Sequence, residues 1–262
     1  MLTWLRQHLQ HLRLAKRSPP MIPDALWLST LQAYPFLTAD SASHTERLRA
    51  MVGEFLADKE FNGAHGLQIS DAMAVAIAAQ ACLPVLHLGL HWYDDFKGIV
   101  VHPGAMLARR EVIDDAGVVH RYKEALTGEA MPHGPVTLSW ADVAASGESA
   151  QAGYNVVIHE FVHKLDMRNG PADGCPPLPS RVVWENWRVT LQASYVRFQD
   201  KVTMAERFGA EPPWLDAYAA SAPAEFFAVT SEAYFVNRDR FAQEFPELMP
   251  LFAQFFNAST AP

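Results

Sequence analysis

The sequence has little cysteine and an excess of acidic residues over basic ones. Its only cysteines among 262 residues, Cys82 and Cys175, are far apart and lack metal-binding spacing. A disulfide framework is therefore not expected, and reduced thiols of a cytosolic protein are the simpler interpretation. The formal net charge is -8. This balance argues against nucleic acid as a direct ligand, because binding phosphates requires clustered Lys and Arg.

Long hydrophobic runs are also missing. No apolar run approaches the roughly 20 residues that cross a bilayer. No N-terminal segment combines a basic start, a continuous apolar stretch and a small-residue cleavage site. We therefore expect a cytoplasmic protein with no membrane partner. Half of the residues are hydrophobic, which is enough for a sizeable core.

The order of helix-like and strand-like patterns predicts a single α+β domain over residues 1–262. Residues 1–20 are expected to form an N-terminal helix or arm, because leucines recur at helical spacing and two prolines end the segment. Residues 21–147 combine helices with a small, mostly antiparallel sheet, and residues 115–117 provide a hairpin turn. Residues 148–262 form a helical half.

Several helices can be placed from capping residues and apolar periodicity. One begins near Ser43 or Thr45, and Ser70-Asp71 caps another over the apolar segment that follows. Three more are predicted in the second half: a single long helix over 147–166, a helix over 181–207, and a helix with Pro223 in its first turn.

One motif in the helical half carries chemistry, because residues 159–163 read His-Glu-Phe-Val-His. Two histidines four residues apart lie one turn apart on the same helix face, so both imidazoles can bind one ion. Glu160 points toward the same cleft, where it can accept a proton from a water molecule that the ion activates. Ile158, Phe161 and Leu165 make this an apolar helix that a domain would bury, and buried histidines need a partner. The motif predicts a hydrolytic site with one zinc ion per chain.

A hydrolytic zinc site usually takes three protein ligands and keeps one open position. His163 is the last histidine of the chain, so the third ligand should be a downstream carboxylate. Glu225 and Glu232 stand out because both lie on one face of an apolar helix, and the residues alone favour Glu225 only slightly. The other downstream glutamates considered are Glu185, Glu206 and Glu211.

Two further features each have two interpretations. Asp166, three residues after His163, either orients a metal-bound histidine or lies on the surface at the end of the helix. Residues 134–140 form either a sheet edge on which an extended peptide substrate pairs or an ordinary edge strand.

Four segments resemble the Mlc titration factor A family of bacterial zinc peptidases. They are AQAC at 79–82, GPVTLSW at 134–140, HEFVHKLD at 159–166 and YAASAPAEFFAVTSEAYF at 218–235. They occur in the same order, and the similarity extends from about residue 20 to 255. The resemblance implies a zincin-like metallopeptidase fold of the gluzincin type.

The resemblance also implies a role for each site residue. His159, His163 and Glu225 would be the zinc ligands, and Glu160 the general base. The catalytic segment is similar to that of anthrax lethal factor, where a tyrosine stands seven residues before the glutamate ligand. Tyr218 has that position here, and its phenol would donate a hydrogen bond to the developing oxyanion.

The function implied by the resemblance is aminopeptidase-type hydrolysis of small peptides. It further implies binding of an Mlc-like transcriptional repressor, which would connect the protein to the control of sugar uptake. The alternative hypothesis is a binding protein that sequesters the regulator and has a vestigial or structural zinc site. Glu160 favours the enzyme, because a structural site needs no base beside its ligands. A weaker third hypothesis is a zinc hydrolase that acts on other bonds.

Overall fold

The structure is a computed structural model, and it describes residues 21–38, 41–113 and 119–258. Within that range the side chains of residues 107–126 are not described. The helix or arm predicted over residues 1–20 and the turn predicted at residues 115–117 therefore lie outside the described residues.

The described part of the chain is mainly helical, with short strands. The strands are β1 (Glu60–Gly63), β2 (Gly98–His102), β3 (Met106–Ile113), β4 (Val119–Leu126), β5 (Gly128–Ala130) and β6 (Val136–Ser139). The helices are α2 (Asp24–Ala33), α3 (Ala42–Asp58), α4 (Asp71–Cys82), α5 (Trp140–Ser149), α6 (Val156–Asp166), α7 (Arg181–Phe208), α8 (Pro223–Val236), α9 (Arg238–Glu244) and α10 (Leu248–Phe256). Single turns of 3-10 helix are η2 (Pro35–Thr38), η3 (Leu90–Tyr93), η4 (Ala150–Ala152), η5 (Met167–Asn169) and η6 (Ala217–Ala220).

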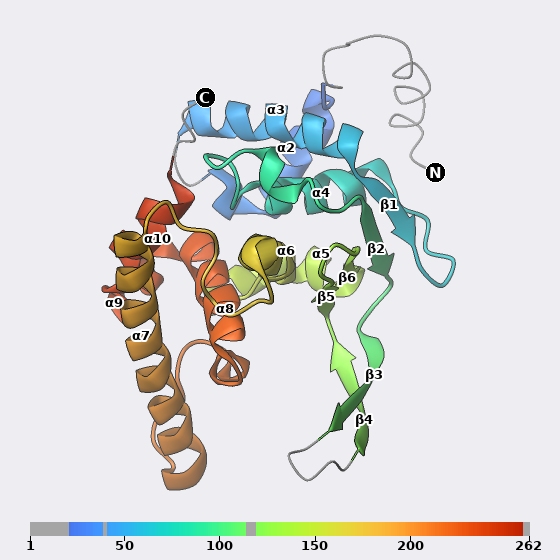
Figure 1. Ribbon diagram of the computed structural model, residues 1–262. Helices are drawn as coiled ribbons and strands as arrows, with labels where there is room; N and C mark the ends of the chain where they lie inside the picture. Colours follow the sequence, from blue (N-terminus) through green and yellow to red (C-terminus); the bar gives the residue numbers. More distant parts are fainter. Residues whose placement is uncertain (1–20, 39–40, 114–118, 259–262) are drawn as a thin grey trace.

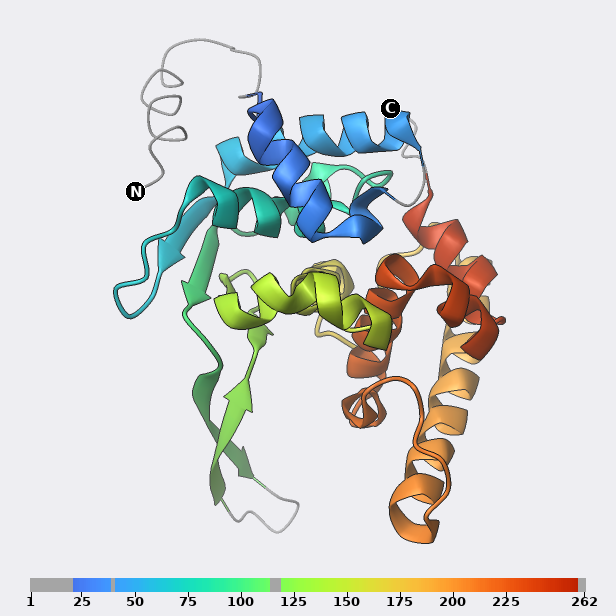
Figure 2. The ribbon, with the colours of Figure 1, turned by 180° about the vertical axis from the view of Figure 1, so that it is seen from behind.

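Helix α6 lies at the centre of the molecule, between three groups of elements. Figure 1 shows α2, α3 and α4 above it, the sheet on one side, and α7 to α10 on the other. The helix packs against α4, α8, β5 and β6, and Figure 2 shows α5 lying across it on the opposite side. Val157, Phe161 and Leu165 of α6 are fully buried. Because the core surrounds this helix, its position is determined from several directions.

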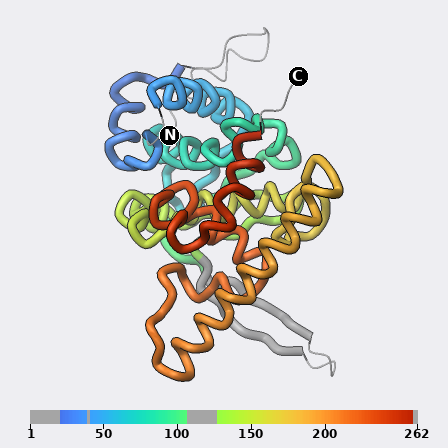
Figure 3. Tube along the Cα trace, turned by 90° about the vertical axis from the view of Figure 1, so that its left-hand side faces the viewer, coloured from blue at the N-terminus to red at the C-terminus, as the bar shows by residue number. Residues whose placement is uncertain are grey.

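Two elements extend beyond this body. The hairpin of β3 and β4 and the C-terminal half of α7 both project downward in Figure 1, and Figure 3 shows the projection of α7 from the side. Strand β4 leads through Thr127 directly into β5, so the hairpin is continuous with a strand that packs on α6.

The four-stranded sheet is mixed, with strand order β1-β2-β6-β5. Strands β1 and β2 are parallel, β2 and β6 are parallel, and only β5 and β6 are antiparallel. The prediction of a mostly antiparallel sheet is therefore wrong for this sheet, although β3 and β4 do form an antiparallel pair. Parallel neighbours require a crossover connection. Helix α4 supplies it between β1 and β2, while β1, with three of its four residues exposed, has no apolar alternation to reveal it.

Strand β6 lies inside the sheet between β2 and β5. The expectation that residues 134–140 form a sheet edge is therefore wrong. In the described sheet the edge beside α6 is β5, which the helix contacts. Strand β6 is buried at all four residues, and an interior position accounts for that pattern.

The single helix predicted over residues 147–166 is two helices. Helix α5 ends at Ser149, and the chain reverses at Gly153, whose φ is 77° in the left-handed region. Asn155 then begins α6 by accepting a hydrogen bond from the amide of Ile158 at 2.9 Å. A glycine with positive φ followed by an asparagine cap ends one helix and starts another.

Other helix predictions are confirmed. Ser70 caps α4, residues 181–208 form α7, and Pro223 occupies the first turn of α8. Helix α3 is capped by Ser41 and not by Ser43 or Thr45. From Trp140 onward every regular element of the described chain is helical. None of the described helices combines the length and the apolar character needed to cross a membrane.

A buried lysine fastens α6 to the sheet edge. The Nζ of Lys164 donates to the carbonyls of Met131, at 2.9 Å, and Gly134, at 3.3 Å, in the turn between β5 and β6. It also lies 3.5 Å from a carboxylate oxygen of Asp95 and 4.5 Å from the ring centre of Phe96. The side chain is fully buried, so its charge is balanced only by these contacts.

Replacing Lys164 by Met should destabilise the protein by about 3 kcal/mol, because Asp95 and two carbonyls would lose a buried donor. Chemical denaturation with a chelator present measures this without a contribution from bound metal. Lys201→Met is the control, since the exposed Lys201 lies 3.7 Å from Glu244 and such surface pairs contribute at most about 1 kcal/mol. Equal small losses in both variants would contradict the role given to Lys164.

Candidate metal centre

Three donor atoms converge beside α6. The Nε2 atoms of His159 and His163 are 3.2 Å apart. The Oε2 atom of Glu225 lies 3.1 Å from the first and 3.2 Å from the second. Glu225 comes from α8, 62 residues after His163. The fold thus brings together the three residues named as ligands from the sequence.

These distances fit a tetrahedral zinc ion. With bonds of about 2.0–2.1 Å, neighbouring ligand atoms lie roughly 3.3 Å apart. One proton could bridge only one pair of the three atoms, whereas one cation satisfies them all. Two imidazoles and a carboxylate suit zinc, and three protein ligands leave a fourth position open. Elsewhere in the described residues, no other three His, Cys, Asp or Glu side chains approach so closely.

The charge of the site also calls for a cation. Burial alone would lower the pKa of His159, but the neighbouring Glu232 and Glu225 carboxylates hold it well above its usual value. Burial would likewise raise the pKa of Glu225, yet hydrogen bonds from the two histidines lower it. The carboxylates therefore favour positive charge at this point, and a metal ion would provide it with both imidazoles neutral.

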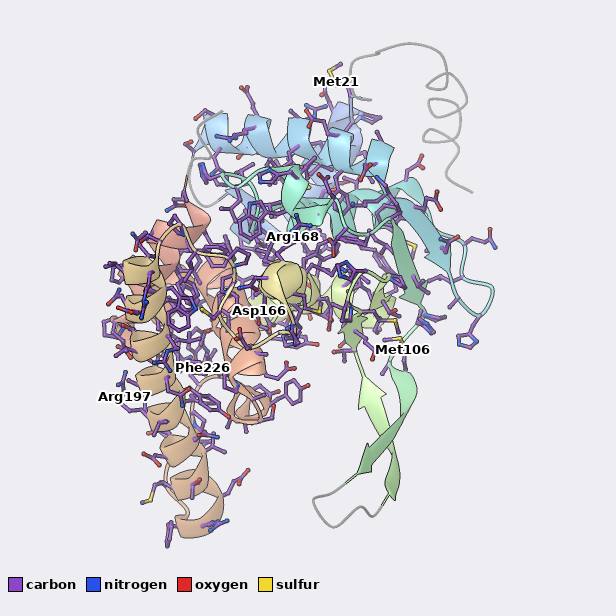
Figure 4. The ribbon with its side chains drawn as sticks, in the orientation of Figure 1. Met21, Met106, Asp166, Arg168, Arg197 and Phe226 are labelled. Atoms are coloured by element: carbon purple, nitrogen blue, oxygen red, sulfur yellow. The ribbon has the colours of Figure 1, made fainter. Side chains whose placement is uncertain are left out.

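Glu225 is placed by the start of α8. Pro223 occupies the first turn of this helix and Glu225 lies in the same turn. A fixed proline φ favours helix initiation there, and the free amide groups of a helix start favour a carboxylate nearby. The interior side of α8 is held by Phe226, which lies between α8 and α7 in Figure 4 and contacts the rings of Tyr195 and Phe198.

A single glycine joins the three helices around the site. The amide of Gly174 donates to Asp166 at the end of α6, at 2.7 Å, and its carbonyl accepts from the indole of Trp187 on α7, at 2.8 Å. Its φ is 82°, and a Cβ atom there would lie 2.7 Å from the carbonyl oxygen of Pro223. A side chain at this position would push the loop away from the start of α8. Because the loop is hydrogen-bonded to α6, this would also increase the distance between Glu225 and His163.

Asp166 has a different role from those anticipated. It is fully buried at the C-terminal end of α6 (Figure 4), so the surface interpretation is wrong. Burial raises its pKa to about 6, against the hydrogen bond from the Gly174 amide. The hydrogen bond that it accepts within the described chain comes from this loop and not from a histidine.

Glu232 contacts the second ring nitrogen of His159. Its Oε1 atom lies 2.7 Å from Nδ1 of that imidazole, and its Oε2 atom accepts from the backbone amide of Asn155. The side chain of Asn155 in turn donates to Gln80 on α4, at 2.7 Å. Glu232, Asn155 and Gln80 are all fully buried. This network fixes the imidazole so that Nε2 faces Glu225. The two candidate glutamates therefore differ in position: Glu225 lies at Nε2 of His159, and Glu232 lies at Nδ1.

Glu160 lies between the ligands and the sheet edge. It is 5% exposed, and burial raises its pKa to about 8, with the carboxylates of Glu225 and Glu232 adding to the effect and the positive charge of His159 opposing it. The carboxylate can therefore exchange a proton near neutral pH.

Two cavities meet at this point. One of about 500 Å³ extends toward Thr127, Tyr154 and Asp216, and one of about 410 Å³ extends toward Glu129, Met167 and Ala172. They share Gly128, His159, Glu160 and Tyr218. The Tyr218 ring lies 6.3 Å from that of His159 and is half exposed, so its side chain stands at the open side of the site.

Sequence reasoning did not identify Asn155, Gln80 or Gly128. Asn155 directly before an apolar run is a helix-start signal, but the single helix predicted over residues 147–166 places it in a helix interior. Gly128 inside a strand pattern signals a close approach of another group. Gln80 gives no chemical signal apart from its buried setting.

Comparisons with known proteins agree with this geometry. The model of the family described as glucose-regulated metallo-peptidase M90 matches residues 3–257. The chain is 38% identical to Mlc titration factor A of Salmonella arizonae over 234 residues, which cover 89% of this chain and 90% of that protein. It is 36% identical to Mlc titration factor A of an Enterobacter species over 243 residues, with 92% and 89% covered. The chain therefore belongs to the glucose-regulated metallo-peptidase M90 family, the family of the Mlc titration factors A.

Proposed function

We propose that this metallopeptidase-family protein is a zinc-dependent peptidase of the aminopeptidase type, with a zincin-like fold and a gluzincin site. The observation that carries the proposal is the triangle of donor atoms from His159, His163 and Glu225, with the Glu160 carboxylate buried beside it. Structural zinc sites are closed by four protein ligands. Three ligands with an adjacent base are typical of a hydrolytic site.

The roles of the side chains follow from their positions. When bound, zinc would lower the pKa of a water molecule and polarise the scissile carbonyl. Glu160 accepts the proton at a carboxylate oxygen and passes it to the leaving amine. Tyr218 donates its phenolic hydrogen to the oxyanion that develops on the carbonyl oxygen. Glu232 accepts from Nδ1–H of His159 and so holds Nε2 toward the metal.

The position of strand β5 favours a peptide as the substrate. In the described sheet β5 is an edge strand that pairs with β6, and both cavities include its residue Gly128. A peptide in extended form can pair with such an edge through its backbone, which leaves alternate side chains to enter the cavities.

The charge of the cavities supports cleavage near an amino terminus. The acidic side chains of Glu129, Glu160, Asp216, Glu225 and Glu232 line them, and none of the described lining residues is Lys or Arg. This surrounding attracts an α-ammonium group and repels a terminal carboxylate. An aminopeptidase fits it better than a carboxypeptidase.

The names of the relatives motivate a partner. We propose that the chain, like the relatives named Mlc titration factor A, binds an Mlc-like repressor and so acts in the control of sugar uptake. The alternative is a protein that only sequesters the regulator and has a vestigial or structural zinc site. The open fourth position and the buried Glu160 favour the enzyme.

Two substitutions separate metal binding from proton transfer. Glu160→Gln should reduce kcat by roughly 10²–10⁴-fold, because the base is lost, while the zinc content stays at one per chain. Glu225→Ala should lower the zinc content itself. Zinc analysis and assays with aminoacyl and peptide chromogenic substrates measure both, with Glu185→Ala on the exposed face of α7 as control. Full activity in Glu160→Gln would refute the role of Glu160 as the base, whereas a zinc-loaded wild-type protein without activity would support the sequestering protein.

Tyr218→Phe should lower kcat by roughly 100-fold with zinc retained, because one donor to the oxyanion is removed. Steady-state kinetics separate this from an effect on KM. Tyr34→Phe is the matched control, since its hydroxyl donates to the carbonyl of Val143 and is absent from both cavities. An unchanged kcat for Tyr218→Phe would leave the oxyanion role without support.

Glu232→Gln should weaken zinc binding by roughly 10- to 100-fold. The Asn155 amide and His159 Nδ1–H both need an acceptor, and a glutamine offers only one oxygen. Competition with a chromogenic chelator measures the affinity, and Glu211→Gln at an exposed position is the control. Equal affinities in the two variants would show that Glu232 does not orient the ligand.

A further inference from the structure

Gly128 begins the edge strand β5, and its backbone is held from several sides. It is paired with Leu138 of β6, and the amide of Ser139 donates to the carbonyl of Thr127 at 2.7 Å. The Thr127 hydroxyl accepts a hydrogen bond from the hydroxyl of Tyr154 at 3.0 Å. The strand therefore cannot move easily away from α6.

The Glu160 side chain occupies the space in which a side chain at position 128 would lie. A Cβ atom on Gly128 would be 2.4 Å from Oε1 of Glu160, 2.6 Å from its Cγ and 2.7 Å from its Cδ. Real Cβ atoms essentially never come closer to a neighbour than 3.0 Å. The three atoms nearest to this position all belong to Glu160, so the glutamate side chain is the first obstacle that a side chain at residue 128 would meet.

The Glu160 carboxylate is the group that would move. Its backbone lies in α6 between the two histidine ligands, and Lys164 fastens that helix to the turn after β5. The end of the glutamate side chain is flexible, whereas helix and strand are both fixed. A side chain at residue 128 would therefore displace the carboxylate and leave His159 and His163 in place.

We propose that Gly128 is a positioning residue for Glu160: the absence of a side chain at the sheet edge sets where the proton-accepting carboxylate lies. Its effect on turnover rests on the proposed peptidase function, but its effect on packing does not. The residue belongs to neither the metal ligands nor the groups that transfer protons. It also lines both cavities, but its proposed effect is on the Glu160 carboxylate.

A double-mutant cycle in metal-free protein tests the packing. Gly128→Ala should lower Tm by roughly 2–8 °C, because the extra methyl group displaces a buried side chain. In Glu160→Ala protein, which lacks all three contacted atoms, the same change should leave Tm unchanged or slightly raised. Gly104→Ala is the control, since a Cβ atom there has no neighbour within 4 Å.

Kinetics test the consequence. Gly128→Ala should reduce kcat at least about tenfold and no further than Glu160→Gln does, with zinc affinity unchanged in a chelator competition. Added to Glu160→Gln, it should cause no further loss, because the two changes remove the same contribution. Gly104→Ala should retain wild-type kcat.

The unfolding and the kinetic experiments can each contradict the proposal. An equal fall in Tm in both backgrounds would show that Gly128 acts on the fold and not through Glu160. Wild-type kcat in Gly128→Ala, or weaker zinc binding, would also exclude the positioning role. If Glu160→Gln alone kept full activity, the proposed peptidase mechanism would fail, and the unfolding cycle would still decide where Gly128 acts.

Discussion

Two imidazole nitrogens and a carboxylate oxygen lie 3.1–3.2 Å from one another, and the surrounding structure serves to hold them there. Three such acceptor atoms repel one another unless protons or a cation lie between them, and a single cation satisfies all three at once. Helix α6 provides two of them through its own periodicity, while the third requires α8 to begin beside it. The loop at Gly174 meets that requirement. It is hydrogen-bonded to Asp166 of α6 and to Trp187 of α7, and it packs on Pro223 of α8. The metal centre is thus a property of how three helices pack.

Position relative to His159 gives the two glutamates of α8 different chemistry. Glu225 lies against Nε2 and is partly exposed, whereas Glu232 lies against Nδ1 and is fully buried. A metal-binding imidazole needs an acceptor on its second nitrogen, so one face of α8 would supply both the proposed ligand Glu225 and the acceptor Glu232 that orients His159. Asn155 links this pair to the start of α6 and to Gln80 of α4. Among these contacts, the one between Glu232 and Nδ1 holds the ring of His159 directly.

The sequence predicts the parts of this site that depend on local spacing, and it fails where distant segments meet. The two histidines, Glu160 and the helix starts at Ser70 and Pro223 follow from periodicity and capping. The residues alone leave Glu225 and Glu232 almost even, because the choice needs the rotation of α8 against α6, which no local pattern contains. Only the family resemblance favours Glu225 clearly. The parallel pairing of β1 and β2 was missed because Glu60–Gly63 lacks apolar alternation. The break between α5 and α6 was missed because a run of good helix formers concealed Gly153 and Asn155.

We propose that the three convergent atoms hold one zinc ion and leave a fourth position open. Anomalous diffraction at the zinc edge, from crystals of the purified protein, would locate this ion. We expect a single strong peak about 2.0–2.2 Å from Nε2 of His159, Nε2 of His163 and Oε2 of Glu225, with Glu160 and Glu232 outside bonding distance. A peak bonded to Glu232 or Glu160 in place of Glu225, or a site closed by a fourth protein ligand, would contradict this proposal.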